Sequence, residues 1–483
     1  MSARSRVAVV GIASALLAVV AGALLLGSSA NATPAAAPDF ARDVAPIVRE
    51  TCAGCHRDGG IAPFAFRTER DLASRAAVLV AALESRRMPP WPPSARSPHY
   101  VGQARRTLDA KERATLVAWA RSQLVRPGGA RRGTPVGAPP PASSPLRAGE
   151  SRLELAMPAS YRPAAANGGT DDYRCFLLDP RLTANRLVTA ARIAPGTASI
   201  VHHVILYRIG RESVAEAVAL DKGARGAGWT CFGGPGVAST GTGNPGGALN
   251  DAGWIAAWAP GWGGDRMRDG TGIPLPAGSR IVMQVHYNLV NGSRRDRSRA
   301  VLTTVPGSKP LEPLHTVLLP APVELACRRG EQGELCDRTA AVFDQARRFG
   351  NDAALVPTGL LLLCGKDAGK PVATTTATCD RVVDAPTTIH AVAGHMHLLG
   401  RSVKVELNPG TARARLLLEI PRWSFHWQAS YVLERPVRAA PGDVVRVTCR
   451  HDASLRTGEP RYVLWGEGTA DEMCLGVLQV TRG

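Results

Sequence analysis

The stretch Cys52-Ala53-Gly54-Cys55-His56 combines residue types that can do redox chemistry. In a C-x-x-C-H pattern the two thiols can bond covalently to a haem while the adjacent histidine binds its iron. A thiol redox pair and one half of a zinc site are the alternative interpretations. A predicted helix leads into the motif and a predicted export signal precedes it, which favours a c-type haem. We therefore expect Cys52, Cys55 and His56 to bind one haem c.

A sixth ligand for that iron is expected from the proline-rich stretch 87–92. Met88 is the only methionine between residues 38 and 125, and the prolines stiffen the loop that presents it. A thioether ligand raises the potential of a haem, which suits an electron carrier. His99 is the alternative ligand. A haem-dependent peroxidase-like enzyme would instead require an open iron site.

Histidines in the second half of the chain fall into two sets. His395 and His397 are two residues apart in an apolar segment, so on a strand they share a face and can reach one metal ion. His202 and His203 are adjacent, and both can reach one ion only where a strand ends or bulges. His286 lies in a strictly alternating run over residues 280–287. We expect three nitrogen ligands in one domain and two in the next.

Four motifs follow one another in order: His202-His203, then Gln284-Val285-His286-Tyr287, then His-x-His-x-x-Gly from His395, then Asp471-Glu472-Met473-Cys474. In this order, residues 170 to 483 resemble the copper type II, ascorbate-dependent monooxygenases. Dopamine beta-monooxygenase and peptidylglycine alpha-hydroxylating monooxygenase belong to that family. The resemblance implies two jelly-roll-like antiparallel sandwiches that each hold one copper and face each other across a cleft.

The resemblance also implies roles for individual residues. His202, His203 and His286 match the all-histidine copper that stores an electron. His395, His397 and Met473 match the copper that binds oxygen and performs the hydroxylation. The ligand types agree, because imidazole suits copper and a thioether holds Cu(I). The disulfides that the resemblance implies are Cys175–Cys231 and Cys449–Cys474, while Cys327, Cys336, Cys364 and Cys379 allow three pairings.

The chain also departs from the family pattern. Peptide-amidating members carry an arginine two residues before the first histidine of His-x-His and a tyrosine four residues after the methionine. Here these positions are Ala393 and Val477, which argues against peptide amidation. The insert from about Arg328 to Lys370 has no counterpart that we can place. We interpret the remaining histidines of this half as structural or as residues that orient a ligand (His315, His390, His426 and His451). Two tryptophans, Trp423 and Trp427, are interpreted as sandwich core.

Composition and turn residues divide the 483 residues into several regions. Asp39 and Thr68 are helix caps in the first of the folded regions, and the chain after residue 150 has the short apolar runs of β-structure. The predicted fold class is multidomain, a small all-α cytochrome c domain followed by two all-β jelly-roll-like sandwich domains. The predicted regions are a signal peptide (1–32), a cytochrome c domain (38–125), a Pro-rich linker (126–150), an N-terminal copper monooxygenase β-sandwich domain (151–305) and a C-terminal one (306–483).

The formal charge of +18 does not indicate a nucleic-acid partner, because the cations are mostly scattered arginines. An apolar run from Val7 to Leu26 precedes the small-x-small pattern Ala30-Asn31-Ala32, which predicts a secretory signal. An uncleaved membrane anchor is the alternative. Ten cysteines are compatible with disulfides in an oxidising compartment. We expect a periplasmic or secreted protein that contacts a membrane only if the signal is not cleaved.

Together these patterns predict an exported, two-copper monooxygenase that hydroxylates a C–H bond of a small organic substrate with O2. The fused haem would deliver the electrons, and an external donor would reduce the haem again. The alternative is a non-catalytic periplasmic haem and copper protein that only transfers electrons.

Overall fold

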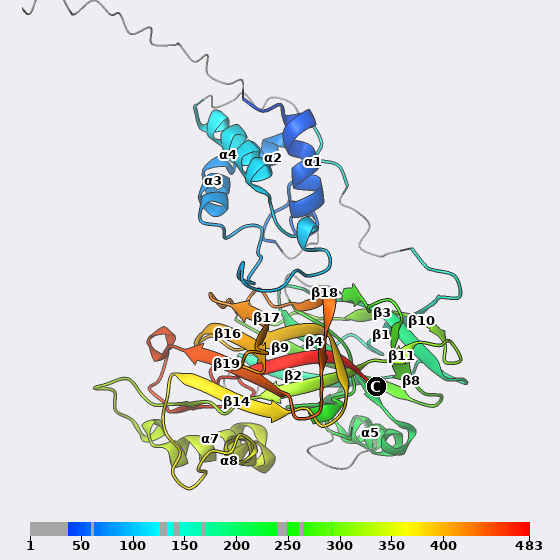
Figure 1. Ribbon diagram of the computed structural model, residues 1–483, viewed down its shortest axis with the longest axis vertical. Coiled ribbons are helices and arrows are strands. Elements are labelled where there is room, and N and C mark those ends of the chain that lie inside the picture. Colours follow the sequence, from blue (N-terminus) through cyan, green and yellow to red (C-terminus); the bar gives the residue numbers. More distant parts are fainter. Residues whose placement is uncertain are drawn as a thin grey trace, which may run out of the picture.

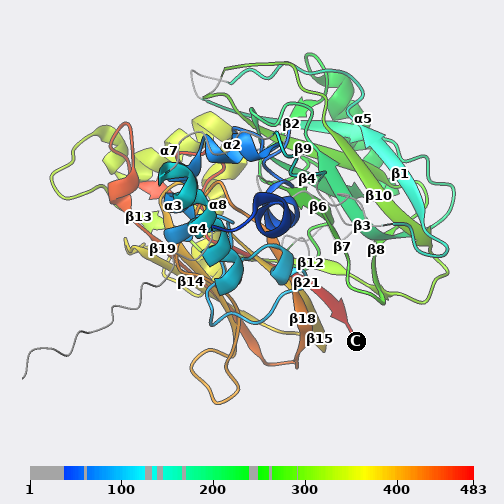
Figure 2. The ribbon, with the colours of Figure 1, turned by 90° about the horizontal axis from the view of Figure 1, so that it is seen from above.

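The computed structural model describes residues 37–58, 62–125, 133–138, 145–165, 170–238, 249–259, 264–290 and 292–483. The predicted signal peptide and the linker residues 126–132 and 139–144 lie outside the described residues. The helices that precede residue 126 gather at one end of the molecule, and the sheets form the rest (Figure 1). Seen from above, these helices lie where the earlier, green strands meet the later, yellow-to-red strands (Figure 2).

The N-terminal segment starts with a helical run in three parts, η1 (Phe40–Val44), α1 (Ala45–Ile47) and η2 (Val48–Cys52). Asp39 caps it by accepting a hydrogen bond from the N–H of Arg42 (2.8 Å). The predicted cap at Thr68 is confirmed, and its side chain forms a capping box with Asp71. The other helices here are α2 (Glu69–Ala73), α3 (Ala76–Glu84), η3 (Gln103–Arg105) and α4 (Ala110–Val125). Among the described residues, no helix has both the length and the apolarity needed to cross a bilayer.

The chain between α3 and η3 docks on the C-terminal half. The N–H of Ser94 donates to the carbonyl of Glu419 (2.8 Å), and the N–H of Val101 donates to that of Val432 (2.8 Å). Tyr100 is 1% exposed and belongs to the core of the C-terminal half. The N-terminal segment is therefore held directly against the β-structure.

The described part of the predicted linker also differs from an exposed tether. Val136 is 1% exposed and packs with the N-terminal helices. Its N–H donates to the carbonyl of Arg67 (2.9 Å), and the carbonyl of Thr134 accepts from the N–H of Glu69 (2.9 Å). Residues 133–138 are thus part of the packed structure.

The first half of the β-structure consists of two antiparallel-rich sheets around one hydrophobic core. One sheet has the order β1-β10-β3-β8-β11, with β7 beside β3; the other has the order β5-β2-β9-β4-β6. The strands of the first are β1 (Ser151–Ala156), β3 (Arg186–Ala194), β7 (Gly264–Arg266), β8 (Thr271–Leu275), β10 (Arg299–Pro306) and β11 (Glu312–Pro313). Those of the second are β2 (Asp171–Leu178), β4 (Val201–Ile209), β5 (Trp229–Thr230), β6 (Trp254–Trp258) and β9 (Arg280–Asn288).

The second half has two four-stranded sheets around another core. Their orders are β12-β21-β15-β18 and β14-β19-β16-β17. The strands of the first are β12 (His315–Pro320), β15 (Thr387–His395), β18 (Ser430–Ala439) and β21 (Leu475–Arg482). Those of the second are β14 (Thr376–Val382), β16 (Gly400–Leu407), β17 (Arg415–Ile420) and β19 (Val444–His451). A short pair, β13 (Glu324–Leu325) and β20 (Val463–Leu464), lies beside them.

The predicted fold class, a small all-α cytochrome c domain followed by two all-β jelly-roll-like sandwiches, is wrong. The described chain is mostly β-sheet with few helices, and its four larger sheets have a propeller-like arrangement. The described residues show no clear all-α domain at the N-terminus, because Tyr100 and its neighbours join the C-terminal half. Among the described residues, helices also interrupt the strands, including α5 (Arg211–Gly223), α7 (Arg338–Phe349) and α8 (Asn351–Leu363). Local periodicity predicts elements but not how they assemble.

Candidate metal centre

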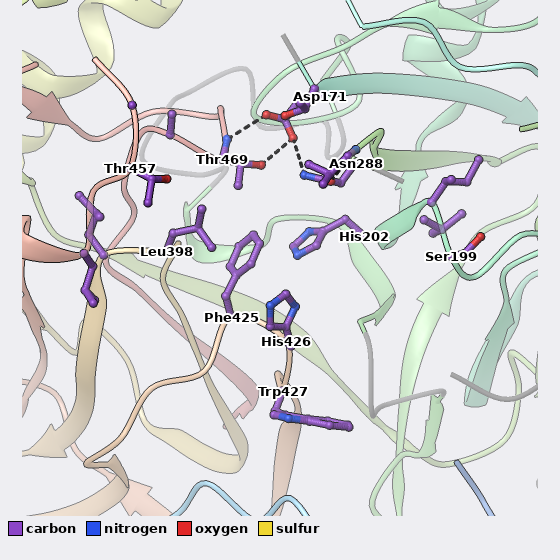
Figure 3. A pocket seen from close by; sticks show the side chains of 18 of the residues that line it. Asp171, Ser199, His202, Asn288, Leu398, Phe425, His426, Trp427, Thr457 and Thr469 are labelled. Atoms are coloured by element: carbon purple, nitrogen blue, oxygen red, sulfur yellow. Dashed lines mark hydrogen bonds between the residues drawn. The ribbon is translucent and has the colours of Figure 1, made fainter. Parts of the chain in front are cut away.

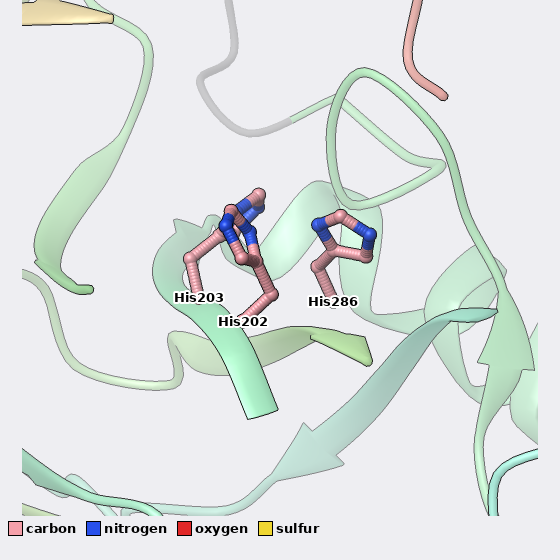
Figure 4. Close-up of side chains that lie close together, drawn as sticks. All are labelled: His202, His203 and His286. Atoms are coloured by element: carbon pink, nitrogen blue, oxygen red, sulfur yellow. The ribbon is translucent and has the colours of Figure 1, made fainter. Parts of the chain in front are cut away.

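Three histidines on two neighbouring strands form a compact cluster. β4 and β9 pair antiparallel with His203 opposite His286, and the register shifts between Val201 and His203. This irregularity lets His202 and His203 approach one point, whereas a regular strand would send them to opposite faces. One possible ligand atom from each of the three rings lies within 4.8 Å of the other two. Figure 4 shows the rings gathered together.

The hydrogen bonds of these rings leave nitrogens free to bind a metal ion. Nε2 of His286 bonds to Asp171 (2.9 Å), and its buried Nδ1 has no partner among the described residues. The Nδ1 atoms of His202 and His203 lie 3.3 Å apart. Two nitrogens on a tetrahedral ion, with bonds of ~2.0–2.1 Å, lie roughly 3.3–3.4 Å apart. The donor set therefore fits a metal ion, and all-imidazole ligation suits copper.

Asp171, at the start of β2, orients this cluster. Its carboxylate accepts hydrogen bonds from Thr469 Oγ1 (2.6 Å) and Asn288 Nδ2 (3.4 Å), as Figure 3 shows. It also contacts Nε2 of His286 (2.9 Å). Burial opposes its ionisation, but the bonds from His286 and Thr469 outweigh burial and lower the pKa of Asp171. The carboxylate holds the Nε2–H form of His286, which turns Nδ1 toward the cluster. No spacing pattern in the sequence points to Asp171.

We expect Asp171→Asn to weaken copper binding at the three-histidine cluster by about 10- to 100-fold, since outer-shell partners of ligand histidines have effects of this size. Competition titration with a copper chelator measures it. Asp172→Asn is the matched control, because this adjacent buried carboxylate bonds instead to Tyr161 and the N–H of Ala164. Equal losses in the two variants would contradict an orienting role for Asp171.

The second histidine set lies at the end of β15. Nδ1 of His395 bonds to Oε1 of Gln428 (2.6 Å), and Nδ1 of His397 bonds to the carbonyl of Asp471 (3.1 Å). Each bond leaves Nε2 as the free ligand atom. The ring centroids are 5.1 Å apart. The two histidines were expected to share one strand. Instead β15 ends at His395, and His397 lies in the connection to β16.

Met473 reaches this set through strand pairing. β21 runs antiparallel to β15 with Leu475 opposite His395, which places Met473 two residues before that pair. The side chain is 8% exposed. The next residue, Cys474, forms a disulfide with Cys449. The register thus brings the thioether to the end of β15 that carries the two histidines.

The two sets adjoin each other. The rings of His203 and His395 have centroids 6.3 Å apart. Phe425 stacks on His202 (4.1 Å) and packs edge-on against His397 (5.9 Å), so one ring contacts both sets. The family resemblance implied two sites across a cleft, whereas here they are neighbours. Neither Phe425 nor Gln428 had a sequence signal, because both come from the loop between β17 and β18.

Burial keeps the imidazoles of His202, His203, His286 and His395 in the neutral form that binds metal. It lowers the pKa of His395 to about 4, with a contribution from His397. The pKa values of His202 and His203 are well below the usual range, and that of His286 is also lowered, in each case mainly because of burial. The two sets are therefore ready to bind a cation at neutral pH.

These shifts predict that the metal-free protein loses stability as pH falls. Unfolded histidine takes up a proton near pH 6.5 but folded His395 only near pH 4, so the unfolded state binds more protons between these values. From pH 7 to pH 5, His395 alone accounts for about 2 kcal/mol of lost unfolding free energy. Urea unfolding at the two pH values measures the loss, and His395→Gln should reduce it by this amount. An unchanged pH dependence in the variant would contradict the assignment.

A cavity of about 790 Å³ adjoins both the N-terminal segment and the three-histidine cluster. His56 and Met88 line one part of it, and His202, Phe425 and His426 line another. Figure 3 shows Phe425 and His426 beside His202. The sequence favours a structural or ligand-orienting role for His426 and a place in the sandwich core for Trp427, whereas both line this cavity.

The C-x-x-C-H motif follows directly from η2. Cys52 and Cys55 are not in a disulfide, and burial raises the pKa of Cys52 to about 12, which disfavours the thiolate that zinc would require. Nδ1 of His56 bonds to the carbonyl of Phe64 (3.2 Å), which leaves Nε2 free. His56 and Met88 line the same cavity, and together with the two free thiols that precede His56 in the sequence they fit a covalent haem. His99, the alternative ligand, is not among the residues that line the cavity.

Four disulfides lie in the described β-structure. The bonds Cys175–Cys231 and Cys449–Cys474 are those that the family resemblance implied. The other two are Cys327–Cys336 and Cys364–Cys379, which decides among the three open pairings. The four bonds are consistent with an extracellular or secreted protein.

The insert that the sequence could not place supports the second histidine set. Arg348 on α7 forms a two-point ion pair with Asp471 (2.6 and 2.9 Å). The carbonyl of the same Asp471 accepts from His397. The insert therefore positions the segment that contacts one of the candidate ligands.

Buried imidazoles with free nitrogens, arranged in two adjoining sets on a mostly β fold, form donor sets that fit metal ions. Residues 367–479 match the family described as copper type II ascorbate-dependent monooxygenase, C-terminal domain. This match includes His395, His397 and Met473, and it supports a copper monooxygenase-type function. No curated protein matches the chain.

Solved structures also show weak similarity. The major capsid protein P2 of bacteriophage PM2 has 9% identity over 69% of this chain and 97% of that chain, with a TM-score of 0.23. The VP2 subviral particle of infectious bursal disease virus has 8% identity over 71% and 75%, with a TM-score of 0.17. Similarities at this level carry no argument about function.

Proposed function

We propose that this chain is an exported copper monooxygenase that hydroxylates a C–H bond of a small organic substrate with O2. It would bind two copper ions, one at His202, His203 and His286 and the other at His395, His397 and Met473. The observation that carries the proposal is the meeting of the two imidazole sets, with His203 and His395 6.3 Å apart between ring centroids. Adjoining sites suit a reaction that takes one electron from each.

When bound, copper supplies one-electron redox chemistry and a site for O2. The protein's own side chains orient the ligand rings and enclose the site. Gln428 fixes the ring of His395, and Asp171 fixes that of His286. Phe425 stacks on His202 and packs edge-on against His397, so its ring shields one side of each imidazole from water.

The cavity beside Phe425 is the proposed substrate site. Its lining is mainly apolar, with Leu398, Phe425 and Trp427 beside the polar side chains of Asn288 and His426. Such a cavity suits a small organic molecule with a reacting C–H bond. Ala393 and Val477 stand where peptide-amidating relatives have their functional side chains, so a peptide substrate is disfavoured.

A haem c on Cys52 and Cys55, with His56 and Met88 as iron ligands, is the proposed electron source. His56, Met88 and His202 line one cavity, so the haem and the three-histidine copper would lie close together. Direct docking through Ser94, Tyr100 and Val101 holds the donor in place, and no mobile tether is needed. An external reductant would then reload the haem.

The experiment is oxygen consumption by the copper-loaded, reduced full chain with a panel of phenylethylamines, aliphatic acids and peptides. We expect consumption that depends on substrate, with one atom of ¹⁸O₂ appearing in the product. His395→Ala should abolish both. If no panel member raises oxygen consumption while haem and copper still exchange electrons, the chain is the non-catalytic electron-transfer protein instead.

A further inference from the structure

Glu472 is a fully buried carboxylate that binds the backbone of the segments carrying His397 and Met473. Its exposed fraction is 0%. Oε2 accepts hydrogen bonds from the backbone N–H of His397 (2.9 Å) and of Met473 (3.1 Å), and Oε1 accepts from that of Leu399 (2.5 Å). Bonds from several N–H groups stabilise a buried charge that would otherwise be costly.

These hydrogen bonds join two segments that are distant in the sequence. His397 and Leu399 belong to the connection between β15 and β16, whereas Met473 precedes β21. Backbone pairing between β15 and β21 stops at His395 and Leu475, so it does not hold His397 or Met473. Glu472 therefore links these two segments beyond the point where β15 and β21 stop pairing.

One buried histidine completes the arrangement. Nε2 of His451, on β19, lies 3.5 Å from Oε2 of Glu472 and bonds to the carbonyl of Met473 (3.3 Å). His451 is 4% exposed. The segment that carries Met473 is thus held on one side by Glu472 and His451 and on the other by the disulfide of Cys474.

We infer that Glu472 is a positioning residue for the second copper site. It sets the separation between the His397 ring and the Met473 thioether, and so determines whether the site is a two-histidine or a two-histidine, one-thioether site. The inference rests on the proposed function, because it takes Met473 as a ligand.

The test variant is Glu472→Gln, which keeps the shape but replaces one acceptor oxygen by an NH₂ group that faces a backbone N–H. With the full chain loaded with Cu(I), we expect affinity at the second site to fall by about 10- to 100-fold. We also expect the sulfur scatterer in the copper X-ray absorption spectrum to weaken or disappear. Copper at His202, His203 and His286 should change by less than about twofold.

Glu324→Gln is the matched control. Glu324 is 3% exposed, lies in the same half of the molecule and is bound by Arg338 rather than by ligand segments. It should lower thermal stability without changing the sulfur signal. If Glu472→Gln does not fold, Glu472→Asp carries the same test, because it keeps the charge but shortens the reach by one methylene.

The outcomes separate the two claims. No sulfur scatterer in the wild-type protein would overturn Met473 as a ligand, and with it the proposed second site. A wild-type sulfur signal that persists unchanged in the Glu472 variant, together with unchanged affinity, would overturn the positioning role alone. Equal losses in the Glu324 variant would also overturn it, because general destabilisation would then explain the result.

Discussion

Met473→Leu is expected to lower hydroxylation by more than about 100-fold, since loss of a ligand should exceed the 10- to 100-fold effects of outer-shell changes. Leucine has a similar volume, so the packing cost in this buried position should stay below about 1.5 kcal/mol. Copper at His202, His203 and His286 should remain. Product formation and copper content of the purified variant measure both effects.

Met396→Leu is the matched control for this prediction. Met396 is 0% exposed, stands between His395 and His397 in the sequence and, like Met473, belongs to the hydrophobic core of the C-terminal half, but it is not a proposed ligand. The control should retain most of the activity. Near-normal turnover in the Met473 variant, or a loss confined to the Met396 variant, would show that the thioether ligand is assigned to the wrong residue.

Rapid haem oxidation is the second large effect that we expect. When pre-reduced, copper-loaded protein meets oxygen and substrate in a stopped-flow mixer, the haem should become oxidised as the copper sites draw electrons. In a His202→Ala, His203→Ala double variant this phase should be lost, because the site nearest to the haem cavity can no longer accept electrons.

The docked N-terminal segment adds a further expectation to this experiment. Because Tyr100 is buried in the C-terminal core, transfer should be intramolecular and its rate independent of protein concentration. A haem that stays reduced while the wild-type copper sites turn over with ascorbate would contradict the route. The haem would then serve another partner.

The residue types of the candidate metal ligands, and much of their spacing, can be read from the sequence alone. Alternation over residues 280–287 predicts the strand that carries His286, and the adjacency of His202 and His203 predicts the need for an irregular strand, which the structure shows. These signals are local, because side-chain direction follows from backbone periodicity. The same reasoning does not place His397 correctly, because β15 ends at His395 and His397 lies after the strand.

The remaining parts of the site depend on contacts between distant segments. Asp171 meets His286 through the pairing of β2 with β9, and Gln428 meets His395 from a loop. The docking of Tyr100 likewise joins residues more than three hundred positions apart in the chain, through its hydroxyl and the carbonyl of Leu417. No spacing rule predicts such pairs, and for the same reason the predicted separation into an all-α domain and two all-β domains is wrong.

The most direct test of the account is anomalous diffraction from copper-loaded crystals, measured on both sides of the copper absorption edge. We expect two copper peaks per chain, one among His202, His203 and His286 and the other at His395, His397 and Met473. In a His286→Ala crystal only the first peak should vanish. A single copper peak in the wild-type protein, or peaks away from these residues, would contradict the account.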